Sequence, residues 1–352
     1  MASMDGDAAL DTLFLPLASG AIRLPDDRGA LFLRARAGAW LHAWPRERFQ
    51  CEQTFKPSAD ALMRAGVNLE PPGDAQRFPL VLALPPRQRE EARALLARAA
   101  RHSAQGGIVV ASQLNNEGAR SGEADLERLA GSIQSLSKHH CRVFWTAPLG
   151  GNVDWALVDE WSALDASRPI ADGRFVSRPG LFAWDRIDMA SALLAVHLPD
   201  TLAGRVADLG AGYGYLAAEV VRRCPRVTAV DLYEAEQRAL EPAQSNLARV
   251  VRDSARDVAL DFLWHDVTTG LPHRYDAIVS NPPFHEGRAD QPELGQAFIA
   301  TAADALAPDG QLWLVANRHL PYEALLAARF VEVRPVVVQD GFKVIAAKGL
   351  RR

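Results

Sequence analysis

The sequence is poor in cysteine and has no long apolar run. Only three cysteines occur among 352 residues and no two form a CxxC pair, so neither a disulfide framework nor a zinc site is expected. No apolar stretch reaches the roughly 18 residues that a membrane-spanning helix needs. The opening residues, MASMDGD, lack the basic and apolar regions of a secretory signal. These absences predict a cytoplasmic protein with no metal and no membrane partner.

Positive charge is not in excess either. The 39 lysines and arginines are outnumbered by 43 aspartates and glutamates, for a net charge of −4. This balance argues against a protein that coats nucleic acid by bulk electrostatics. The hydrophobic share of 48% and the length of 352 residues predict a globular chain with two domains.

The second half alternates strand-like and helix-like segments, a pattern typical of a parallel α/β sheet. Its last two strands flank Asp340-Gly341, a strong hairpin signal. We therefore expect a parallel sheet that is finished by an antiparallel hairpin. The expected strands are 205–209, 226–230, 259–263, 277–280, 311–316, 331–338 and 342–347, and the expected helices are 187–198, 215–223, 234–251 and 294–306.

The first half contains an echo of this order. A strand at 80–84 meets Pro85-Pro86, as the later strand meets Pro282-Pro283, and the helix 90–100 and the strand 108–111 follow. Any α/β protein shows strand, helix and strand in this order, so the echo alone does not prove a duplication.

A true duplication would have a chemical consequence. It would place Leu84 where the second half has Asn281, and no glycine-rich loop occurs in the first 100 residues. The first half would then be a duplicate that has lost its chemistry. The expected domains are 1–150, with a structural or RNA-docking role, and 173–352, with the chemistry, joined by a linker at 151–172.

A glycine-rich turn joins the first strand of the second half to the following helix. It reads DLGAGYG, with an acid at Asp208 and glycines at Gly210, Gly212 and Gly214. Glycine permits positive φ and a close approach of backbone to ligand, and a helix N-terminus presents free N–H groups. A dinucleotide fingerprint would need a third glycine where this chain has Tyr215. Because Asp208 repels pyrophosphate but can hold an ammonium group, the turn favours a ligand with an amino-acid moiety over NAD.

Two further acids follow the next two strands. Asp231, 21 residues after Gly210, is placed to accept both hydroxyls of a ribose, although it could instead cap the next helix. Asp266 follows the third strand and could take the amino group of an adenine, or it could be an ordinary loop aspartate. Since ligands of open α/β sheets bind at the carboxyl ends of strands, the set describes S-adenosylmethionine.

The strand 277–280 ends at Asn281-Pro282-Pro283-Phe284. Two prolines give a rigid, non-helical exit because proline fixes φ and has no N–H. The exit offers two oxygen acceptors, on the Asn281 side chain and the Pro282 carbonyl, next to an aromatic ring. Two acceptors and a flat apolar face suit a planar ring that carries an amino group.

These motifs together resemble a known family. DLGAGYG from Asp208 and NPPFH from Asn281 look like the class I methyltransferases, and specifically the bacterial rRNA guanine-N2 methyltransferases. The resemblance extends over RPGLFAWDRID at 178–188 and LVANRHL at 314–320, covers residues 170–352 well, and covers the first half weakly. One departure is Asp266, where some relatives carry Asn.

The resemblance implies a fold, a cofactor and a substrate. The implied fold is two tandem Rossmann-like methyltransferase domains, a degenerate N-terminal one and a C-terminal one with a seven-stranded sheet. The cofactor is S-adenosylmethionine, and the substrate is ribosomal RNA or a ribosomal subunit, with 16S rRNA favoured and 23S rRNA next. The protein is expected to act as a monomer without metal.

The motifs also predict how transfer proceeds. If Asn281 Oδ1 and the Pro282 carbonyl accept the two N–H bonds of a guanine amine, its lone pair turns toward the methyl donor. Alignment is then the main task, worth roughly 7–11 kcal/mol in good cases, and no strong base is needed. Phe284 is expected to stack on the base.

Other functions stay open at this stage. The same Asn-Pro-Pro-aromatic element serves adenine-N6 and protein-glutamine methyltransferases, and a non-catalytic RNA-binding or assembly factor is the alternative from another class. RNA docking by the first half would use a row of arginines and a basic cluster, unless these form an ordinary solvated face. The residues are Arg87, Arg89, Arg93, Arg98, Arg101, Lys138, His139, His140 and Arg142.

Overall fold

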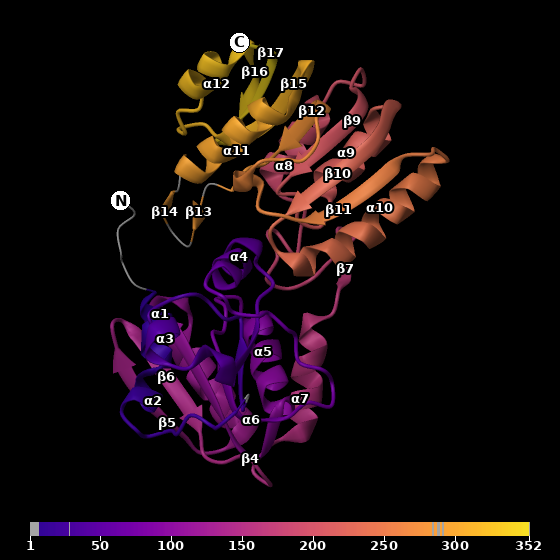
Figure 1. Ribbon diagram of the computed structural model, residues 1–352. Helices are drawn as coiled ribbons and strands as arrows, with labels where there is room; N and C mark the ends of the chain where they lie inside the picture. The colour runs from indigo at the N-terminus through magenta and orange to yellow at the C-terminus, as the bar shows by residue number, and fades with distance from the viewer. Residues whose placement is uncertain (1–6, 28, 284, 287–288, 291, 352) are drawn as a thin grey trace. The chain divides into compact units, whose positions relative to one another are not determined.

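The computed structural model describes residues 7–27, 29–283, 285–286, 289–290 and 292–351. The chain divides into two compact units, Met1–Ala166 and Ser167–Arg352, which Figure 1 colours from indigo to magenta and from rose to yellow. Within the described ranges, no helix is long and apolar enough to cross a membrane. The same ranges contain no group of three or more His, Cys, Asp or Glu side chains suited to hold a metal ion.

The second unit is built on a seven-stranded sheet of order β11-β10-β9-β12-β15-β17-β16. The first five strands in this order are parallel, and β17 is antiparallel to both of its neighbours. Positive φ at both Asp340 and Gly341 is the turn geometry that a two-residue hairpin favours. The predicted sheet and hairpin are confirmed. The strands are β9 (Ala203–Leu209), β10 (Arg226–Glu234), β11 (Ala259–Trp264), β12 (Tyr275–Ser280), β15 (Leu306–Asn317), β16 (Phe330–Gln339) and β17 (Phe342–Leu350).

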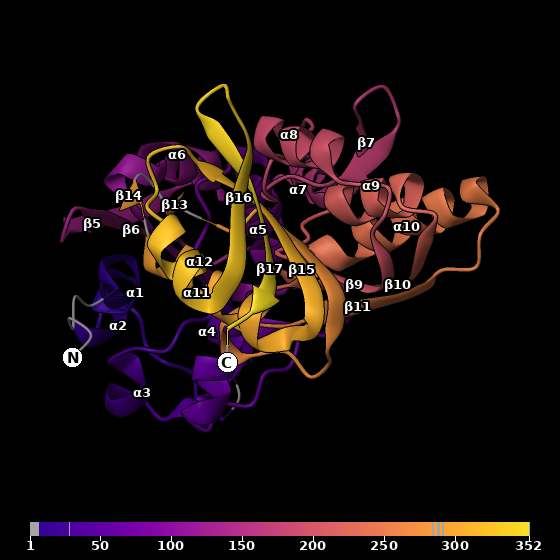
Figure 2. The same ribbon diagram turned by 90° about the horizontal axis from the view of Figure 1, so that it is seen from above.

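Helices cover both faces of this sheet. Successive strand residues point to opposite faces, so Val206 lies in the core shared with α8, α9 and α10 while Ala207 lies in the core shared with α11 and α12. Figure 2 shows the two sets of helices on opposite sides of the strands. The helices are α8 (Met189–His197), α9 (Tyr215–Arg223), α10 (Leu240–Ser254), α11 (Pro292–Ala305) and α12 (Glu323–Arg329), with short strand pairs β7 (Arg168–Ile170) and β8 (Phe175–Ser177), and β13 (His285–Glu286) and β14 (Ala289–Asp290).

The first unit repeats this topology with one strand fewer. Its sheet has the order β2-β1-β3-β4-β6-β5, which matches β10-β9-β12-β15-β17-β16. In place of β11, the described residues of this unit have only an isolated parallel bridge between Cys51 and Leu69. The strands are β1 (Ala30–Leu33), β2 (Phe49–Glu52), β3 (Phe78–Ala83), β4 (Ser103–Leu114), β5 (Ile133–Lys138) and β6 (Cys141–Thr146). The helices are α1 (Ala8–Leu13), α2 (Leu15–Ala18), α3 (Trp40–Ala43), α4 (Lys56–Arg64), α5 (Arg89–Arg101), α6 (Ala119–Ala130) and α7 (Trp155–Ser162).

The two sheets agree in detail. The pairing of β3 with β4 shifts register after Phe78, and the pairing of β12 with β15 shifts after Tyr275. The last paired residues, Ala83 and Ser280, are followed by Leu84 and Asn281, each before two prolines. Leu84 therefore occupies the place of Asn281, and the duplicated fold with a degenerate first copy is confirmed.

The predicted linker at 151–172 is wrong. Helix α7 lies in this range and buries Leu157, Val158 and Trp161 in a core of the first unit. The boundary between the units falls after Ala166 instead. Gly150 and Gly151, a pair typical of a linker, turn the chain into one more helix of the same unit.

Five of the six predicted RNA-docking arginines form ion pairs inside the first unit. Asp125, which is buried, accepts hydrogen bonds from two of them, and three others pair with separate carboxylates. The structure therefore favours the alternative interpretation, a face of ion pairs that holds the helices of this unit. The pairs are Arg89–Asp125, Arg93–Asp125, Arg98–Glu52, Arg101–Asp159 and Arg142–Glu123.

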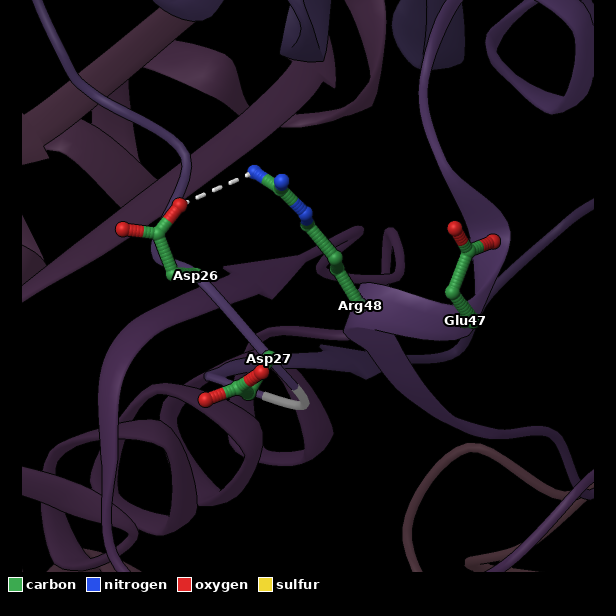
Figure 3. Close-up of a pocket in the computed structure, with 4 residues that line it drawn as sticks. All are labelled: Asp26, Asp27, Glu47 and Arg48. Carbon is green, nitrogen blue, oxygen red and sulfur yellow. Dashed lines mark ion pairs between the residues drawn. The ribbon is translucent and has the colours of Figure 1, made fainter.

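A polar hollow of about 400 Å³ also lies in the first unit, lined by Asp26, Asp27, Glu47 and Arg48 (Figure 3). Arg48 Nη1 lies 3.3 Å from Asp26 Oδ1, and the other two acids have no ion pair drawn to them. None of the four is a predicted site residue. An open, acid-lined hollow without a buried polar anchor is an ordinary surface feature, and we assign it no ligand.

Candidate active site

The glycine turn lies where the sequence predicts it. Strand β9 ends at Leu209, and helix α9 begins at Tyr215 behind Gly214, whose φ is +84°. Gly214 is needed for packing, because a Cβ there would lie 2.7 Å from Leu247 Cδ2. Gly212 differs, for its φ is +53° and no heavy atom lies within 4 Å of where its Cβ would be. The turn is thus open at Gly212, where a ligand can approach the backbone.

Asp208 lies beneath this turn and is fully buried. Its Oδ2 accepts a hydrogen bond of 2.9 Å from the Ala217 N–H in the first turn of α9. Its Oδ1 is shielded from solvent and has no hydrogen-bond partner. Burial, together with a smaller effect of the nearby Glu234, raises the pKa of the carboxyl to about 7. A buried acceptor without a donor is costly, so this atom indicates a ligand that brings a donor or a positive charge.

Glu234 ends strand β10 at the same edge of the sheet. Its Oε2 accepts from the Gly212 N–H at 2.7 Å and its Oε1 from the Glu236 N–H at 2.8 Å. Burial raises the pKa of this carboxyl too. Two carboxyls with raised pKa beside one open turn favour a cationic ligand, because a nearby positive charge stabilises both ionised forms.

Asp231 is not part of this group, and the prediction that it ends its strand is wrong. It lies three residues before the end of β10, about 10 Å back along the strand. Its buried Oδ2 accepts from Arg205 Nε at 2.9 Å and from the Tyr275 hydroxyl at 2.6 Å. Asp231 therefore completes an internal ion pair, and the acid at the carboxyl end is Glu234.

Asp266 lies two residues beyond the end of β11, beside the end of β10. It is half-buried and caps a short helical turn, with Oδ1 accepting from the Thr268 N–H at 2.9 Å and from its hydroxyl at 2.7 Å. The loop role that the sequence left open is thus present. Contact of this carboxyl with an adenine amine stays a prediction.

Asn281 follows β12, the strand next to β9. Its Nδ2 donates to Asp188 Oδ2 at 3.0 Å and to Ser191 Oγ at 2.9 Å. Its Oδ1 is shielded from solvent and has no partner. Pro282 is buried beside it. Phe284 lies outside the described residues, so the predicted stacking ring stays a prediction.

The site therefore presents two unpartnered buried acceptors, Asp208 Oδ1 and Asn281 Oδ1, at the ends of neighbouring strands. The backbone registers place Asp208 opposite Val279, two residues before Asn281. One acceptor is acidic and suits a cation, and the other is neutral and suits an N–H donor. Together they can hold a charged ligand and an amine on adjacent strands.

Sequence reasoning missed Glu234, Asp188 and Ser191. Glu234 could have been found, because the strand pattern continues through Leu232 and Tyr233 and its last acid is the one at the sheet edge. Asp188 has the position of a helix N-cap, which the sequence reveals. Its contact with a residue 93 positions later has no sequence signal.

Residues 172–346 match the family model described as methyltransferase small domain. A curated relative from Psychromonas ingrahamii, named ribosomal RNA small subunit methyltransferase C, is 28% identical over 272 residues, or 77% of this chain and 76% of its own length. The protein of the same name from Pseudomonas paraeruginosa is 36% identical over 184 residues, 52% of this chain and 53% of its own.

A solved structure is similar over nearly the whole chain. It is the 16S rRNA N2 methyltransferase of T. thermophilus in complex with AdoMet and guanosine, with a TM-score of 0.78 and 25% sequence identity. The match covers 97% of this chain and 92% of that one. Both units are included in this similarity, so the two-unit architecture is shared.

Proposed function

Since this chain belongs to the S-adenosylmethionine-dependent rRNA methyltransferases, we propose that it methylates the exocyclic N2 amine of a guanine in 16S ribosomal RNA. The observation that carries this proposal is the unpartnered Oδ1 of Asn281, one strand away from the acid-flanked glycine turn. A methyl donor with a positive charge and a target with an N–H group are the two ligands that these acceptors require.

The residues around the glycine turn fit S-adenosylmethionine. Asp208 Oδ1 would meet its ammonium group, Gly212 would let the backbone approach it, and Glu234 would accept from the ribose hydroxyls, with Asp266 at the adenine end. When bound, S-adenosylmethionine supplies an activated methyl group. The two carboxyls with raised pKa support this assignment, because an anionic dinucleotide would raise them further.

Asn281 and Pro282 would orient the target. The Asn281 carboxamide oxygen and the Pro282 carbonyl accept the two N–H bonds of the guanine amine, which turns the amine lone pair out of conjugation with the ring. Phe284 would stack on the base. No strong general base is required in this arrangement, because the residues contribute mainly alignment and the methylated amine, once cationic, is acidic enough to give its proton to water, while the donor leaves as a neutral thioether. The target base leaves its stack to reach them.

Methyl transfer from a labelled donor onto 30S subunits, 50S subunits and naked rRNA tests this function. We expect label on one guanine N2 of 16S rRNA, located by mapping the modified nucleotide, and none on 50S subunits. Label on an adenine, or on protein, would overturn the proposal. The Asn281→Ala variant is the control: transfer should fall at least about 100-fold while cofactor affinity stays within about twofold, because only alignment is lost.

The oligomeric state of the enzyme and its location in the cell are a separate proposal. We propose that the enzyme works as a monomer in the cytoplasm, where ribosomal subunits are assembled. Size-exclusion chromatography with light scattering checks the first part, and a mass of twice the 38.3 kDa of the chain would contradict it.

A further inference from the structure

The side chain of Asn281 is held by two residues of another element. Asp188 is the N-cap of helix α8 and its Oδ2 accepts from the Ser191 N–H at 2.8 Å. The same Oδ2 accepts from Asn281 Nδ2 at 3.0 Å, and the Ser191 hydroxyl oxygen accepts from that nitrogen at 2.9 Å. Both hydrogens of the Asn281 amide group are therefore used by helix α8.

Asp188 and Ser191 determine the orientation of the Asn281 carboxamide, with its NH₂ end toward helix α8 and its oxygen on the other side. An ionised carboxylate has no hydrogen to donate, so only the NH₂ end of Asn281 can bond to Asp188. Turning the amide over would set its oxygen against the Asp188 carboxylate oxygen, so that two acceptors would face each other and the hydrogen bond between Asn281 and Asp188 would be lost. The carboxamide oxygen is accordingly the end left without a protein partner.

The first unit shows that the fold does not need this network. Its helix α1 packs on β4 and β6 as α8 packs on β15 and β17, and Asp7 caps α1 through the Leu10 N–H at 3.1 Å. The place of Ser191 is taken there by Leu10 and that of Asn281 by Leu84, both buried in one apolar core. The helix cap is thus common to both units, whereas the polar pair beneath it occurs in the unit with the glycine turn.

We infer that Asp188 and Ser191 are positioning residues that fix Asn281 with its carboxamide oxygen toward the target amine. The inference rests on the proposed function for its purpose. Its chemical consequence is selectivity: a site that offers a fixed acceptor pairs with a target edge that donates hydrogen, and disfavours an edge that presents a carbonyl oxygen. Asp188 thereby excludes the reversed amide, which would favour the wrong edge, and Ser191 holds the second hydrogen of the correctly oriented amide.

Steady-state transfer to 30S subunits and calorimetric S-adenosylmethionine binding test the inference on Asp188→Ala and Ser191→Ala. Asp7→Ala is the matched control, since it removes the same kind of helix cap from the first unit. We expect kcat to fall about 10- to 100-fold in both test variants, because a freed carboxamide misplaces the target. Cofactor affinity should stay within about twofold of the control, because the network orients the amine and not the donor.

A second readout does not depend on activity. The side-chain NH₂ signals of Asn281, identified by their loss in Asn281→Ala, should exchange slowly with solvent in the parent protein and in Asp7→Ala. They should exchange faster in Asp188→Ala and Ser191→Ala. If the exchange does not change, or if both variants transfer as fast as the control, the inference is wrong.

Two further outcomes are distinguishable. A loss of cofactor affinity as large as the loss of kcat would make Asp188 a cofactor ligand and would overturn the positioning role. Failure of the parent protein to methylate 30S subunits would instead count against the proposed function. The exchange measurement would still decide whether Asp188 and Ser191 hold the amide.

Discussion

Three acids of strands β9 and β10 lie close in sequence or register and yet have different surroundings. Asp231 has Arg205 and Tyr275 as partners, so its charge is compensated within the protein. Asp208 and Glu234 receive only backbone N–H donors, and burial raises the pKa of both. An acid that is paired with a cation of the protein stabilises the fold. Acids with a raised pKa bind a positively charged ligand favourably, because its charge stabilises their ionised form.

The first prediction concerns Asp208 and pH. With a pKa of about 7, the carboxyl takes up a proton as pH falls below that value, and a bound ammonium group must expel it. The affinity for S-adenosylmethionine should therefore fall as pH is lowered from about 7.5 to 5.5, by up to about tenfold per unit below the pKa.

Calorimetry in two buffers of different protonation enthalpy measures this linkage, with proton release expected on binding below pH 7. The Asp208→Asn variant should bind more weakly at the upper end of the range and lose the extra pH dependence. An unchanged pH slope in that variant would show that Asp208 does not meet the cation.

The same linkage acts on folding. Since the pKa of Asp208 is raised in the folded state, the carboxyl destabilises the unliganded protein progressively as pH rises from about 4 to 7.

The second prediction separates Glu234 from Asp231. Glu234→Gln should weaken cofactor binding about tenfold or more, because a hydrogen bond to a charged group contributes about 1.5–3 kcal/mol. Asp231→Asn should leave cofactor affinity within about twofold and lower the melting temperature, because Arg205 loses its partner. Calorimetry measures the cofactor affinity of both variants, and thermal unfolding measures their melting temperatures. The reverse pattern would restore the ribose contact to Asp231.

Among the helices and strands, the ones that could be predicted from the sequence are those whose position depends on local residue patterns. The seven strands, the helix after the glycine turn and the hairpin at Asp340-Gly341 follow from apolar runs, glycine and turn residues. Strand β10 runs four residues beyond its expected end, because it pairs with β9 as far as Tyr233 and with β11 as far as Glu234. That pairing is tertiary, so the local pattern predicts the end of the strand near Asp231, whereas the structure has Glu234 there.

The candidate site divides in the same way. The glycine turn, Asp208 and Asn281 carry motifs and were found from sequence, whereas the anchoring of Asn281 by α8 joins segments that are far apart in the chain. No local pattern in a single sequence indicates which distant residues will form such a hydrogen bond. The echo in the first half, by contrast, can be read from the sequence, because two prolines follow the corresponding strand in each half.

The third prediction uses that echo. Placing leucine at both Ser191 and Asn281 gives the second unit the apolar pair that Leu10 and Leu84 form in the first. Each single substitution leaves a polar group without its partner, so the double variant should be more stable than the sum of the singles by about 1 kcal/mol. Denaturant unfolding measures the coupling, and methyl transfer should be lost in all variants that lack Asn281. Additive or worse-than-additive destabilisation would mean that the two positions are not equivalent between the units.

At the scale of the whole molecule, one topology occurs twice with different contents. In the first unit, the register of β1 with β2 and β3 places Phe32 where the second has Asp208, and Arg34 where it has Gly210. Arg34 keeps the positive φ of +55° that the glycine has, so the backbone turn survives the substitution. Its guanidinium forms an ion pair with Glu91 of helix α5. A strand corresponding to β11 is absent from the described part of this unit.

The last prediction follows from these substitutions. The first unit keeps the frame of a cofactor site, but it has Phe32 in place of the acid and Arg34 in place of Gly210, and only an isolated bridge where the second unit has β11. We therefore expect each chain to bind one molecule of S-adenosylmethionine, with a calorimetric stoichiometry near one. Glu234→Gln and Asp208→Asn, combined, should remove this binding without exposing a second, weaker phase. A stoichiometry of two, or a residual phase in the double variant, would show that the first unit still binds cofactor. Since Arg34, paired with Glu91, stands at the position of Gly210, its side chain also takes the place of a residue without one, and one unit of the pair is left to carry the chemistry.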